Sequence, residues 1–525
     1  MAKLGETMVW DIRTSNGNEA AKIRYEVLPY VAAGGLDVGC GPSKVWPHLI
    51  GIDSEKDTAL FGVPMKPDIV VPDAARLSIF ADGSADSVFS SHLLEHIADW
   101  QAALREWWRL VKVGGHLVLY LPHADLYPRI GQPGANPDHK HDFTPDDIVD
   151  FMRLAFADWS LLQNQVRGEG AEYSFLLVLR KEAAGHGQAH PHAAPRAEKT
   201  AGLVRVGGNG DALWAGSVAA HLHAQGYAVT AYVAKNGEEV LRHDPHIARI
   251  VVMPTGLLND DEMLEFWAHE GPKYDRWVNL IGSVEGRLLP HQSVHEFYLP
   301  QGVRHQLMDR NYLDMVHAYA ELPAGTPSRQ KFYPTEAEIE WARKMRAEIA
   351  GPFVLLSPTG SGPFKAWPHA QRFMELMADA GIATVMVGDL QDLPDLDIVT
   401  RHGTDYGHVV GQEWPLRLAM TMALQADAVV ATESVFANAV AMEAMPKVVM
   451  LSHSSHENLT RDWVNTAALE APVACHPCHR IHNRAAAMCS RDTITGKSAC
   501  MASYSADAVA DLVLKALRVE QKAAA

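Results

Sequence analysis

Short apolar runs alternate with amphipathic helical patterns along most of this chain of 525 residues. Apolar runs typical of buried strands lie in its first part at 36–38, 49–53, 85–91, 116–122 and 174–181. A helical pattern covers 98–111, and Thr144-Pro-Asp-Asp147 has the form of a capping box that begins a further helix. Strands that alternate with helices predict an α/β fold with a parallel sheet covered on both faces.

The same alternation begins again twice in the second part of the chain. Further strands are predicted at 202–208, 229–234, 249–254, 276–282, 353–357, 382–389, 427–434 and 447–452. Thr335 and Glu338 form a second capping box at the start of a long helix. Residues 183–200 are rich in Ala, Gly, Pro and His, which is a linker composition. We therefore expect the domains and the linker at 1–182, 183–200 (linker), 201–335 and 336–525.

Composition restricts the kinds of partner that we expect. The 46 basic and 63 acidic residues give a formal net charge of −17, which disfavours broad contact with nucleic acid. No apolar run approaches the roughly 20 residues of a membrane span. The N-terminal segment lacks the features of a secretory signal, so a cytoplasmic location is expected. The sequence does not fix the oligomeric state.

A first glycine-rich loop, LDVGCGPSKVW, follows the first predicted strand. Asp37, Gly39 and Gly41 lie in it, and Asp53 ends the next strand. Glycines let the backbone turn tightly and approach a ligand, and an acidic residue at the end of the next strand can bind a ribose diol. By itself a GxG pattern can also be no more than a turn.

With Asp73 in VPDAARL and the segment SVFSSHLLEHI, residues of about 30–182 resemble the class I S-adenosylmethionine-dependent methyltransferases. The resemblance implies a Rossmann-like domain with S-adenosylmethionine as its cofactor. It also implies that the loop of Asp37, Gly39 and Gly41 holds the methionine portion, that Asp53 binds the ribose and that Asp73 contacts the adenine.

The sequence gives a weaker signal for the site that binds the methyl acceptor. His139 and His141 lie in DHKHDF, directly before the capped helix. They are candidates for an acceptor-site base. The alternative is a solvated or locally hydrogen-bonded loop. Glu95-His96 is a scaffold pairing in the similar family.

A second glycine-rich loop, GLVRVGGNGDALW, contains Gly208, Gly210 and Asp211. It is not a P-loop, because no GK[ST] completes it. The loop resembles that of glycosyltransferase family 9, the heptosyltransferase family, and the resemblance covers about 202–520. It implies a GT-B fold of two Rossmann-like halves and an inverting transfer with Asp211 as general base. The alternative role for Asp211 is a helix cap.

Two later segments resemble the donor-binding segments of the same family. SPTGSGPFKAWPHAQRF supplies Thr359 and Ser361 as hydrogen-bonding groups for a diphosphate, and Lys365 as a counter-charge for the leaving nucleotide. ATESVFANAV supplies Glu433 and Ser434. At this place the similar family usually has a motif closer to Asp-Thr-Gly-x-x-His. This departure leaves open which sugar and nucleotide are bound and whether activity is retained.

Four of the five cysteines are clustered near the end of the chain, at Cys475, Cys478, Cys489 and Cys500. Such a quartet suits tetrahedral zinc or iron, whereas a CxxC redox pair would leave the last two unexplained and two disulfides would need an oxidising compartment. CHPCHRIH with the preceding HENLTRDWVNT resembles autotransporter-type protein heptosyltransferases, which carry iron in a cysteine cluster. We expect a closed, structural metal site in segment 471–503.

Together these patterns predict a bifunctional glycan-modifying enzyme, in which a methyltransferase is fused to a glycosyltransferase. The expected partners are a nucleotide-sugar donor, with ADP-heptose as a candidate, and a glycan or protein acceptor. The alternative is a methyltransferase that an inactive glycosyltransferase-like binding module recruits to a glycan or protein.

Overall fold

The structure is a computed structural model that describes residues 18–54, 65, 67–169, 172–183, 199–253, 258–389, 391–393, 414–482 and 489–523. The chain divides into two compact units. The first comprises Met1–Arg196 with Val252–His269, and the second comprises Ala197–Val251 with Glu270–Ala525. Most of the linker expected at 183–200 lies outside the described residues.

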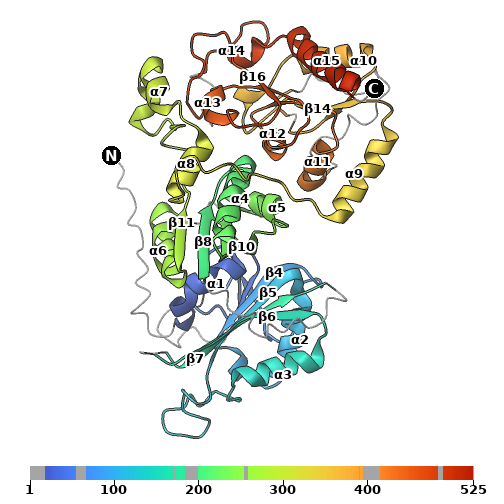
Figure 1. The fold of residues 1–525 in the computed structure, drawn as a ribbon. Helices are drawn as coiled ribbons and strands as arrows, with labels where there is room; N and C mark the ends of the chain where they lie inside the picture. The colour runs from blue at the N-terminus through green and yellow to red at the C-terminus, as the bar shows by residue number, and fades with distance from the viewer. Residues whose placement is uncertain are drawn as a thin grey trace. The chain divides into compact units, whose positions relative to one another are not determined.

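The first unit is built on a seven-stranded sheet with the order β3-β2-β1-β4-β5-β7-β6 (Figure 1). Its strands are β1 (Leu36–Val38), β2 (Ile50–Asp53), β3 (Ile69–Val70), β4 (Ala85–Ser91), β5 (Val111–Pro122), β6 (Trp159–Arg167) and β7 (Ser174–Lys181). Strands β3, β2, β1, β4 and β5 pair in parallel. This sheet order places the carboxyl ends of β1, β2 and β4 at one edge, next to the first glycine-rich loop.

The expectation of a wholly parallel sheet is wrong at its far edge. Strand β7 pairs antiparallel with both β5 and β6. Only residues 168–173 separate β6 from β7. A parallel crossover needs a dozen or more residues, so a connection this short forces the chain to reverse direction.

Helices pack against this sheet. They are α1 (Arg24–Val31), α2 (Trp100–Leu110) and α3 (Pro145–Ala155), with the short 3-10 helices η1 (Glu19–Ile23) and η2 (Leu94–His96). The capping box at Thr144 is confirmed, since its N–H donates to Asp147 Oδ2 at 2.7 Å. Residues 258–269, most of α6 (Asp260–Glu270), also group with the first unit. The buried faces of α2 and α3 join the strands in one apolar core.

The second unit contains two sheets. The four-stranded sheet has the order β10-β9-β8-β11 and the five-stranded sheet the order β13-β12-β14-β15-β16. Their strands are β8 (Lys199–Arg205), β9 (Tyr227–Val233), β10 (Ile247–Val252), β11 (Arg276–Asn279), β12 (Phe353–Ser357), β13 (Ala383–Met386), β14 (Ala428–Thr432), β15 (Lys447–Met450) and β16 (Thr466–Leu469). Strand β8 pairs in parallel with β9 and β11, and the five-stranded sheet is parallel throughout.

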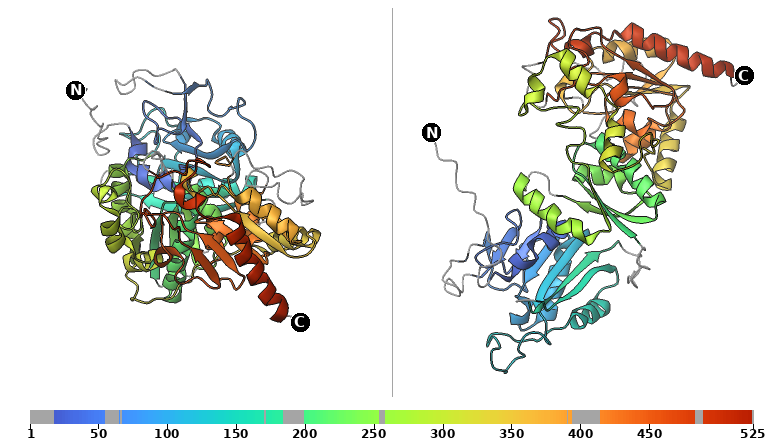
Figure 2. Two further views of the ribbon diagram at one scale, coloured as in Figure 1. Left: turned by 90° about the horizontal axis from the view of Figure 1, so that it is seen from above. Right: turned by 60° about the vertical axis from the view of Figure 1, so that its left-hand side comes forward.

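The second unit also contains helices, several of which pack on these two sheets. They are α4 (Asn209–Ala224), α5 (Lys235–Leu241), α7 (Gln301–Met308), α8 (Tyr312–Tyr319), α9 (Glu336–Glu348), α10 (Ala370–Asp379), α11 (Leu416–Ala423), α12 (Val435–Ala439), α13 (His456–Leu459), α14 (Ala499–Ala502) and α15 (Ala506–Ala523). The capping box of Thr335 and Glu338 at the start of α9 is confirmed. Helices α10 and α15 lie side by side over one face of the five-stranded sheet (Figure 2).

The ends of three parallel strands position the predicted residues of the second unit. The second glycine-rich loop follows β8, the segment with Thr359 follows β12, and Glu433 follows β14. Loops at the carboxyl ends of parallel strands are where open α/β sheets bind ligands. The predicted donor and base residues therefore belong to the functional edges of both sheets.

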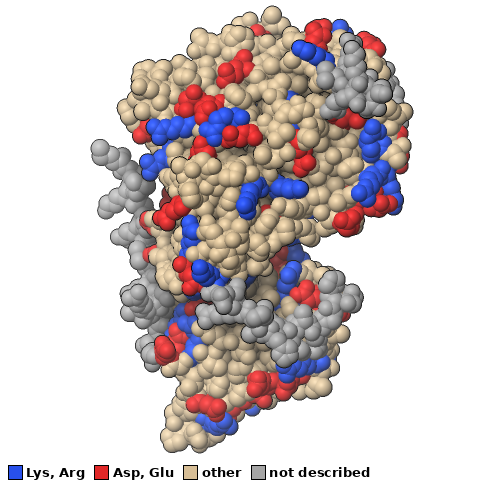
Figure 3. Space-filling model, viewed as in Figure 1, with Lys and Arg blue, Asp and Glu red and all other residues tan. Residues whose placement is uncertain are grey.

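Two properties of the described residues bear on partners. No described helix combines the length and the apolar character that crossing a bilayer would require. On the face drawn in Figure 3, basic and acidic side chains are interspersed.

Candidate functional site

A cavity of about 960 Å³ lies in the first unit at the carboxyl ends of β1, β2 and β4. The structure brings four predicted cofactor residues together on its wall: Asp37, Gly39, Gly41 and Asp53. His139 lines the same cavity from the loop that precedes α3. The volume is in the range of sites that enclose small-molecule ligands.

The two acidic residues hold the first glycine-rich loop in shape. Buried Asp37 accepts the N–H of Val45 at 2.7 Å. The pKa of Asp37 is raised to about 7, mainly because the group is buried; the N–H of Val45 opposes this rise, and the nearby carboxylate of Asp53 contributes to it. Asp53 accepts the N–H of Gly41 at 2.7 Å. Both carboxylates therefore hold the loop, and both residues line the cavity.

Gly39 shows why this loop needs glycine. Its φ is +80°, in the left-handed region that residues with a side chain rarely adopt. A Cβ at Gly39 would lie 2.7 Å from the side chain of Leu93. The backbone can therefore approach the segment after β4 only without a side chain at this position.

Two residues predicted for this site lie elsewhere. Asp73 is not among the cavity residues, and its carboxylate accepts the N–H of Ala75 at 2.9 Å in a local turn. The ring of His141 is 3.1 Å from the carbonyl oxygen of Ala98 and stacks on Phe143. The locally hydrogen-bonded alternative thus describes His141, whereas His139 is at the cavity.

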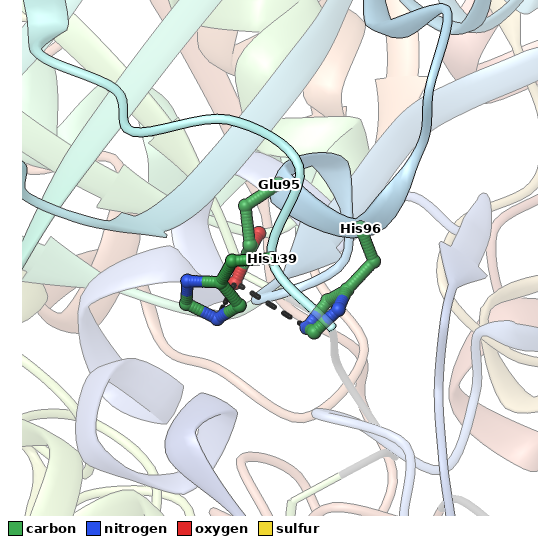
Figure 4. Close-up of side chains that lie close together, drawn as sticks. All are labelled: Glu95, His96 and His139. Carbon is green, nitrogen blue, oxygen red and sulfur yellow. Dashed lines mark ion pairs between the residues drawn. The ribbon is translucent and has the colours of Figure 1, made fainter. Parts of the chain in front are cut away.

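The cavity wall also holds an acidic group that sequence reasoning treated as scaffold. Glu95 is fully buried, and its Oε1 lies 3.9 Å from His139 Nε2 and 4.0 Å from His96 Nε2 (Figure 4). Burial raises the pKa of Glu95 to about 8. Neither Glu95 oxygen has a hydrogen-bond partner among the described residues.

A second cavity, of about 760 Å³, lies in the second unit and is lined by loops from both of its sheets. All the residues predicted for donor binding and base catalysis line it: Gly208, Gly210, Asp211, Thr359, Ser361, Lys365, Glu433 and Ser434. They come from three segments that together span more than 200 residues of the chain, so their meeting is a result of the fold.

Asp211 lies in the first turn of α4, and two neighbours hold it. Its Oδ2 accepts the N–H of Gly208 at 2.9 Å and lies 3.2 Å from the guanidinium of Arg205. The same guanidinium contacts Glu285 at 2.9 Å. Burial raises the pKa of Asp211 although Arg205 opposes the shift. Asp211 is thus both a capping residue and a basic carboxylate at the cavity wall.

The segment after β12 brings a hydroxyl and an ammonium group to the cavity. Thr359 is buried, and its Oγ1 has no hydrogen-bond partner among the described residues. Lys365 Nζ donates to the carbonyl oxygen of Glu433 at 3.1 Å and lies 3.4 Å from Glu433 Oε2. A Cβ at Gly360 would meet the Lys365 side chain at 2.5 Å, so glycine is needed for this close packing.

Glu433 lines the cavity but is already bound on several sides. Its carboxylate accepts from the N–H and hydroxyl of Ser452, from the N–H of Ser454 and from the ring of His453 at 2.7 Å. Burial alone would raise the pKa of Glu433, but His453 and Lys365 hold it well below its ordinary value. Glu433 therefore fixes the loop 452–454 and Lys365 in place.

Sequence reasoning missed several residues of the second cavity, among them the charged or ionisable Arg205, Glu285 and His453. A signal existed for Arg205, since GLVRVGG places one cation inside an otherwise apolar strand. A charge at such a position needs a buried partner. No local pattern marks Glu285 as that partner, because it lies 80 residues away.

The four clustered cysteines line one small cavity of about 80 Å³. All are free thiols, and burial raises the pKa of Cys500 to about 12 and that of Cys478 higher still. Among the described residues, two groups of three His, Asp or Glu side chains hold their ligand atoms within 4.8 Å of one another, and neither includes a cysteine. The thiols share a cavity, but no three stand together at that separation.

Known proteins resemble the two units separately. Residues 36–119 match the family model described as a methyltransferase domain. A glycosyl transferase of family 9 from Veillonella parvula is 14% identical, with 61% of this chain and 97% of that chain covered and a TM-score of 0.45. ADP-heptose LPS heptosyltransferase II of E. coli is also 14% identical, with 62% and 99% covered and a TM-score of 0.42.

A methyltransferase structure is similar to the first unit. An S-adenosylmethionine-dependent methyltransferase from Mesorhizobium loti is 18% identical, with 31% of this chain and 99% of that chain covered and a TM-score of 0.24. No curated protein sequence matches the chain. The three sheets confirm the expected α/β fold class, a Rossmann-like domain followed by a two-halved, GT-B-like region. The chain thus joins a segment that matches the methyltransferase domain family to a region similar to family 9 glycosyltransferases.

Proposed function

We propose that this chain is a bifunctional glycan-modifying enzyme, a methyltransferase fused to an inverting glycosyltransferase that uses a nucleotide-sugar donor. The observation that carries the proposal is the cavity of the second unit. It collects Asp211 from one sheet edge and Thr359 and Lys365 from the other. A base and a phosphate-binding group on opposite sides of one cavity are what a transfer between two substrates needs.

The transfer would use Asp211 as the general base. An acceptor hydroxyl loses its proton to the Asp211 carboxylate as its oxygen bonds to the anomeric carbon. The bond from that carbon to the phosphate oxygen breaks, and the electron pair leaves with the nucleoside diphosphate. The raised pKa of Asp211 makes it a stronger base, and general-base catalysis contributes about 10²–10⁴-fold.

Thr359 and Lys365 would receive the diphosphate of the donor. A buried hydroxyl without a partner is costly in the free protein, and a phosphate oxygen can accept its hydrogen bond. The Lys365 ammonium supplies a positive charge for the negative charge that develops on the leaving group. Ser361 lines the same side. ADP-heptose is a candidate donor, because it is the donor named for the similar E. coli enzyme.

The first unit would bind S-adenosylmethionine in its cavity. Asp53 lies at the end of β2, where an acidic residue can bind a ribose diol, and Gly39 and Gly41 give the loop its shape. The sulfonium group carries a positive charge, and the wall includes the carboxyl groups of Glu19, Asp37, Asp53, Glu95 and Asp138. When bound, the cofactor supplies the methyl group. His139 is the nearby candidate for taking a proton from an acceptor.

The four clustered cysteines would hold one structural iron or zinc ion. Thiols are soft ligands suited to both metals, and they become thiolates when a metal binds. Their residues line one cavity, so moderate side-chain movement can bring the sulfur atoms together. The buried His482 lies 3.6 Å from Cys478 Sγ and would be a neighbour of such a site. The ion would pin segment 471–503 to the five-stranded sheet.

One observation favours the alternative of a binding module that does not catalyse. The Glu433 carboxylate is occupied by His453, Ser452 and Ser454, so it offers little to a donor sugar. A glycan or protein could then bind the cavity without being modified. An intact Asp211 at the cavity wall supports the catalytic function instead.

Native mass spectrometry of the full chain, with S-adenosylmethionine and a panel of nucleotide sugars, tests the proposal. We expect one S-adenosylmethionine and one nucleotide sugar to bind the same chain together, because the two cavities share no residue. Failure of every nucleotide sugar to bind would overturn the glycosyltransferase function. Failure of S-adenosylmethionine would overturn the methyltransferase function.

A further inference from the structure

The wall of the first cavity contains a compact set of metal-ligand side chains. Glu95 and His96 lie on η2, and His139 lies on the loop before α3. One ligand atom from each falls within 4.8 Å of the others. Figure 4 shows the three side chains pointing toward one another. Two imidazoles and one carboxylate are a set that divalent zinc, iron, cobalt and nickel accept.

The buried carboxylate of Glu95 is the second observation. It is fully buried, and neither of its oxygens has a hydrogen-bond partner among the described residues. Around Oε1 lie imidazole nitrogens of His92 at 3.7 Å, of His139 at 3.9 Å and of His96 at 4.0 Å. A buried carboxylate without hydrogen bonds is costly, so a native fold retains one where something compensates it.

The distances leave room for an ion. Ligand atoms that surround one tetrahedral metal at about 2.1 Å lie about 3.4 Å apart. The separations of Oε1 from the His96 and His139 nitrogens, 4.0 and 3.9 Å, exceed this value by about half an ångström. Small side-chain rotations would therefore bring these three groups to bonding distance. If Glu95 were hydrogen-bonded directly to one of these histidines, its oxygen and the ring nitrogen would lie closer together than two ligands of one metal ion do.

Backbone hydrogen bonds fix the positions of the proposed ligand residues relative to one another. The N–H groups of Lys140 and His141 both donate to the carbonyl oxygen of Glu95, at 2.8 and 3.2 Å. These two bonds dock the loop on η2 and place His139 over the carboxylate. His92 has the left-handed φ of +50°, and its Nε2 lies 3.0 Å from Ser174 Oγ. His92 is thus tied to β7 and lies beside the three ligands.

We propose that Glu95, His96 and His139 bind a divalent first-row transition-metal ion on the wall of the methyltransferase cavity. All three residues line that cavity, so the remaining coordination positions of the ion would face it and take an oxygen ligand, such as a hydroxyl of the methyl acceptor. That last role rests on the proposed function, whereas metal binding does not. As a ligand, His139 would hold the acceptor through the ion and would not be a free base.

Titration of the metal-free full chain with Co²⁺, followed by visible absorption, tests the site. The Cys475→Ser/Cys478→Ser/Cys489→Ser/Cys500→Ser variant serves as the parent, because it lacks all four thiolates of the other proposed metal site. We expect one equivalent of Co²⁺ with ligand-field bands and no thiolate charge-transfer band. The unmodified chain should show the same ligand-field bands. If the cysteine variant does not fold, the titration of the unmodified chain therefore tests the site.

Matched variants then identify the ligands. Glu95→Gln keeps the shape and removes the charge, and His139→Ala removes one imidazole. Each should weaken Co²⁺ binding by at least about 100-fold, more than the roughly 10–100-fold lost with outer-shell partners. His141→Ala is the matched control. The His141 ring contacts the carbonyl oxygen of Ala98, so this variant should bind Co²⁺ as tightly as the parent. Circular dichroism confirms that each variant is folded.

The outcomes separate this inference from the proposed function. Folded Glu95→Gln and His139→Ala variants that bind Co²⁺ as tightly as the parent would overturn the metal site, as would a folded parent without ligand-field bands. Loss of S-adenosylmethionine binding with Co²⁺ binding intact would instead overturn the methyltransferase function and leave the metal site standing.

Discussion

Asp211 and Glu285 share one guanidinium: Arg205 lies 3.2 Å from Asp211 Oδ2 and 2.9 Å from Glu285 Oε1. Both carboxyl groups line the second cavity. The negative charge of Glu285 adds to the effect of burial in raising the pKa of Asp211, and Arg205 opposes them. After burial and Arg205, the strength of the proposed base therefore also depends on Glu285, a residue that no local motif reveals.

The pH dependence of turnover follows from this pair. A general base works when deprotonated, so the rate should fall as the pH is lowered through the pKa of Asp211, above the ordinary value of about 3.9. Glu285→Gln removes a neighbouring negative charge, lowers that pKa and should move the acid limb to lower pH. Exposed Glu340→Gln on α9 is the control. Superimposable acid limbs in all three proteins would exclude this electrostatic coupling.

Thr359→Val probes the donor side. The Oγ1 atom has no partner among the described residues, so its removal should leave the thermal midpoint unchanged or higher. Donor affinity should fall by about 0.5–1.5 kcal/mol, the worth of one hydrogen bond, as measured by calorimetry. Thr432→Val is the matched control, since its hydroxyl is also buried without a described partner but does not line the cavity. Equal affinity in both variants would remove Thr359 from the site.

Asp53→Ala tests cofactor binding in the first unit. If Asp53 holds the ribose hydroxyls, S-adenosylmethionine should bind the full chain more weakly by about 1.5–3 kcal/mol, the range for charge-assisted hydrogen bonds. Asp150→Ala, an exposed residue of α3, should bind the cofactor normally. Calorimetry measures the cofactor affinity of both variants. An unchanged affinity in Asp53→Ala would show that Asp53 does not hold the ribose.

Cys478→Ser tests the cysteine site. The purified protein should contain one equivalent of iron or zinc bound by thiolates, and the variant should lose it together with the protease resistance of segment 471–503. Structural metal contributes on the order of 10 kcal/mol in small zinc modules, so the loss should be evident. Cys40→Ser changes the one cysteine outside the cluster and should keep the metal. A protein that is purified without thiolate-bound metal, or full metal content in Cys478→Ser, would contradict the site.

Local signals in the sequence predicted local structure well. The capping boxes at Thr144 and Thr335 depend on residues three positions apart, and both form. Strand β6 was missed because most of its second half is exposed and polar, which leaves no apolar run to detect. Strand β7 was predicted, but its antiparallel direction was not, because strand direction depends on the length of a connection and not on the residues within the strand.

Site residues were predicted where a loop motif carries them. The residues of the second glycine-rich loop and of the two donor segments all line one cavity. Arg205, Glu285 and His453 were missed because their roles arise from partners brought together by the fold. His139 and His141 look equivalent in sequence, yet the two backbone bonds to Glu95 turn only His139 toward the cavity. Residues two positions apart can thus differ in role through backbone contacts with a residue about 45 positions earlier in the chain.

The central claim is that the second unit catalyses glycosyl transfer with Asp211 as its base. Its most direct test is the rate at which the full chain and Asp211→Asn release nucleoside diphosphate from a nucleotide sugar that binds both. The account predicts release by the unmodified chain and a fall of about 10²–10⁴-fold in Asp211→Asn at unchanged donor affinity. Equal rates would reduce Asp211 to the cap of α4, and tight donor binding without release by either protein would identify the second unit as a binding module.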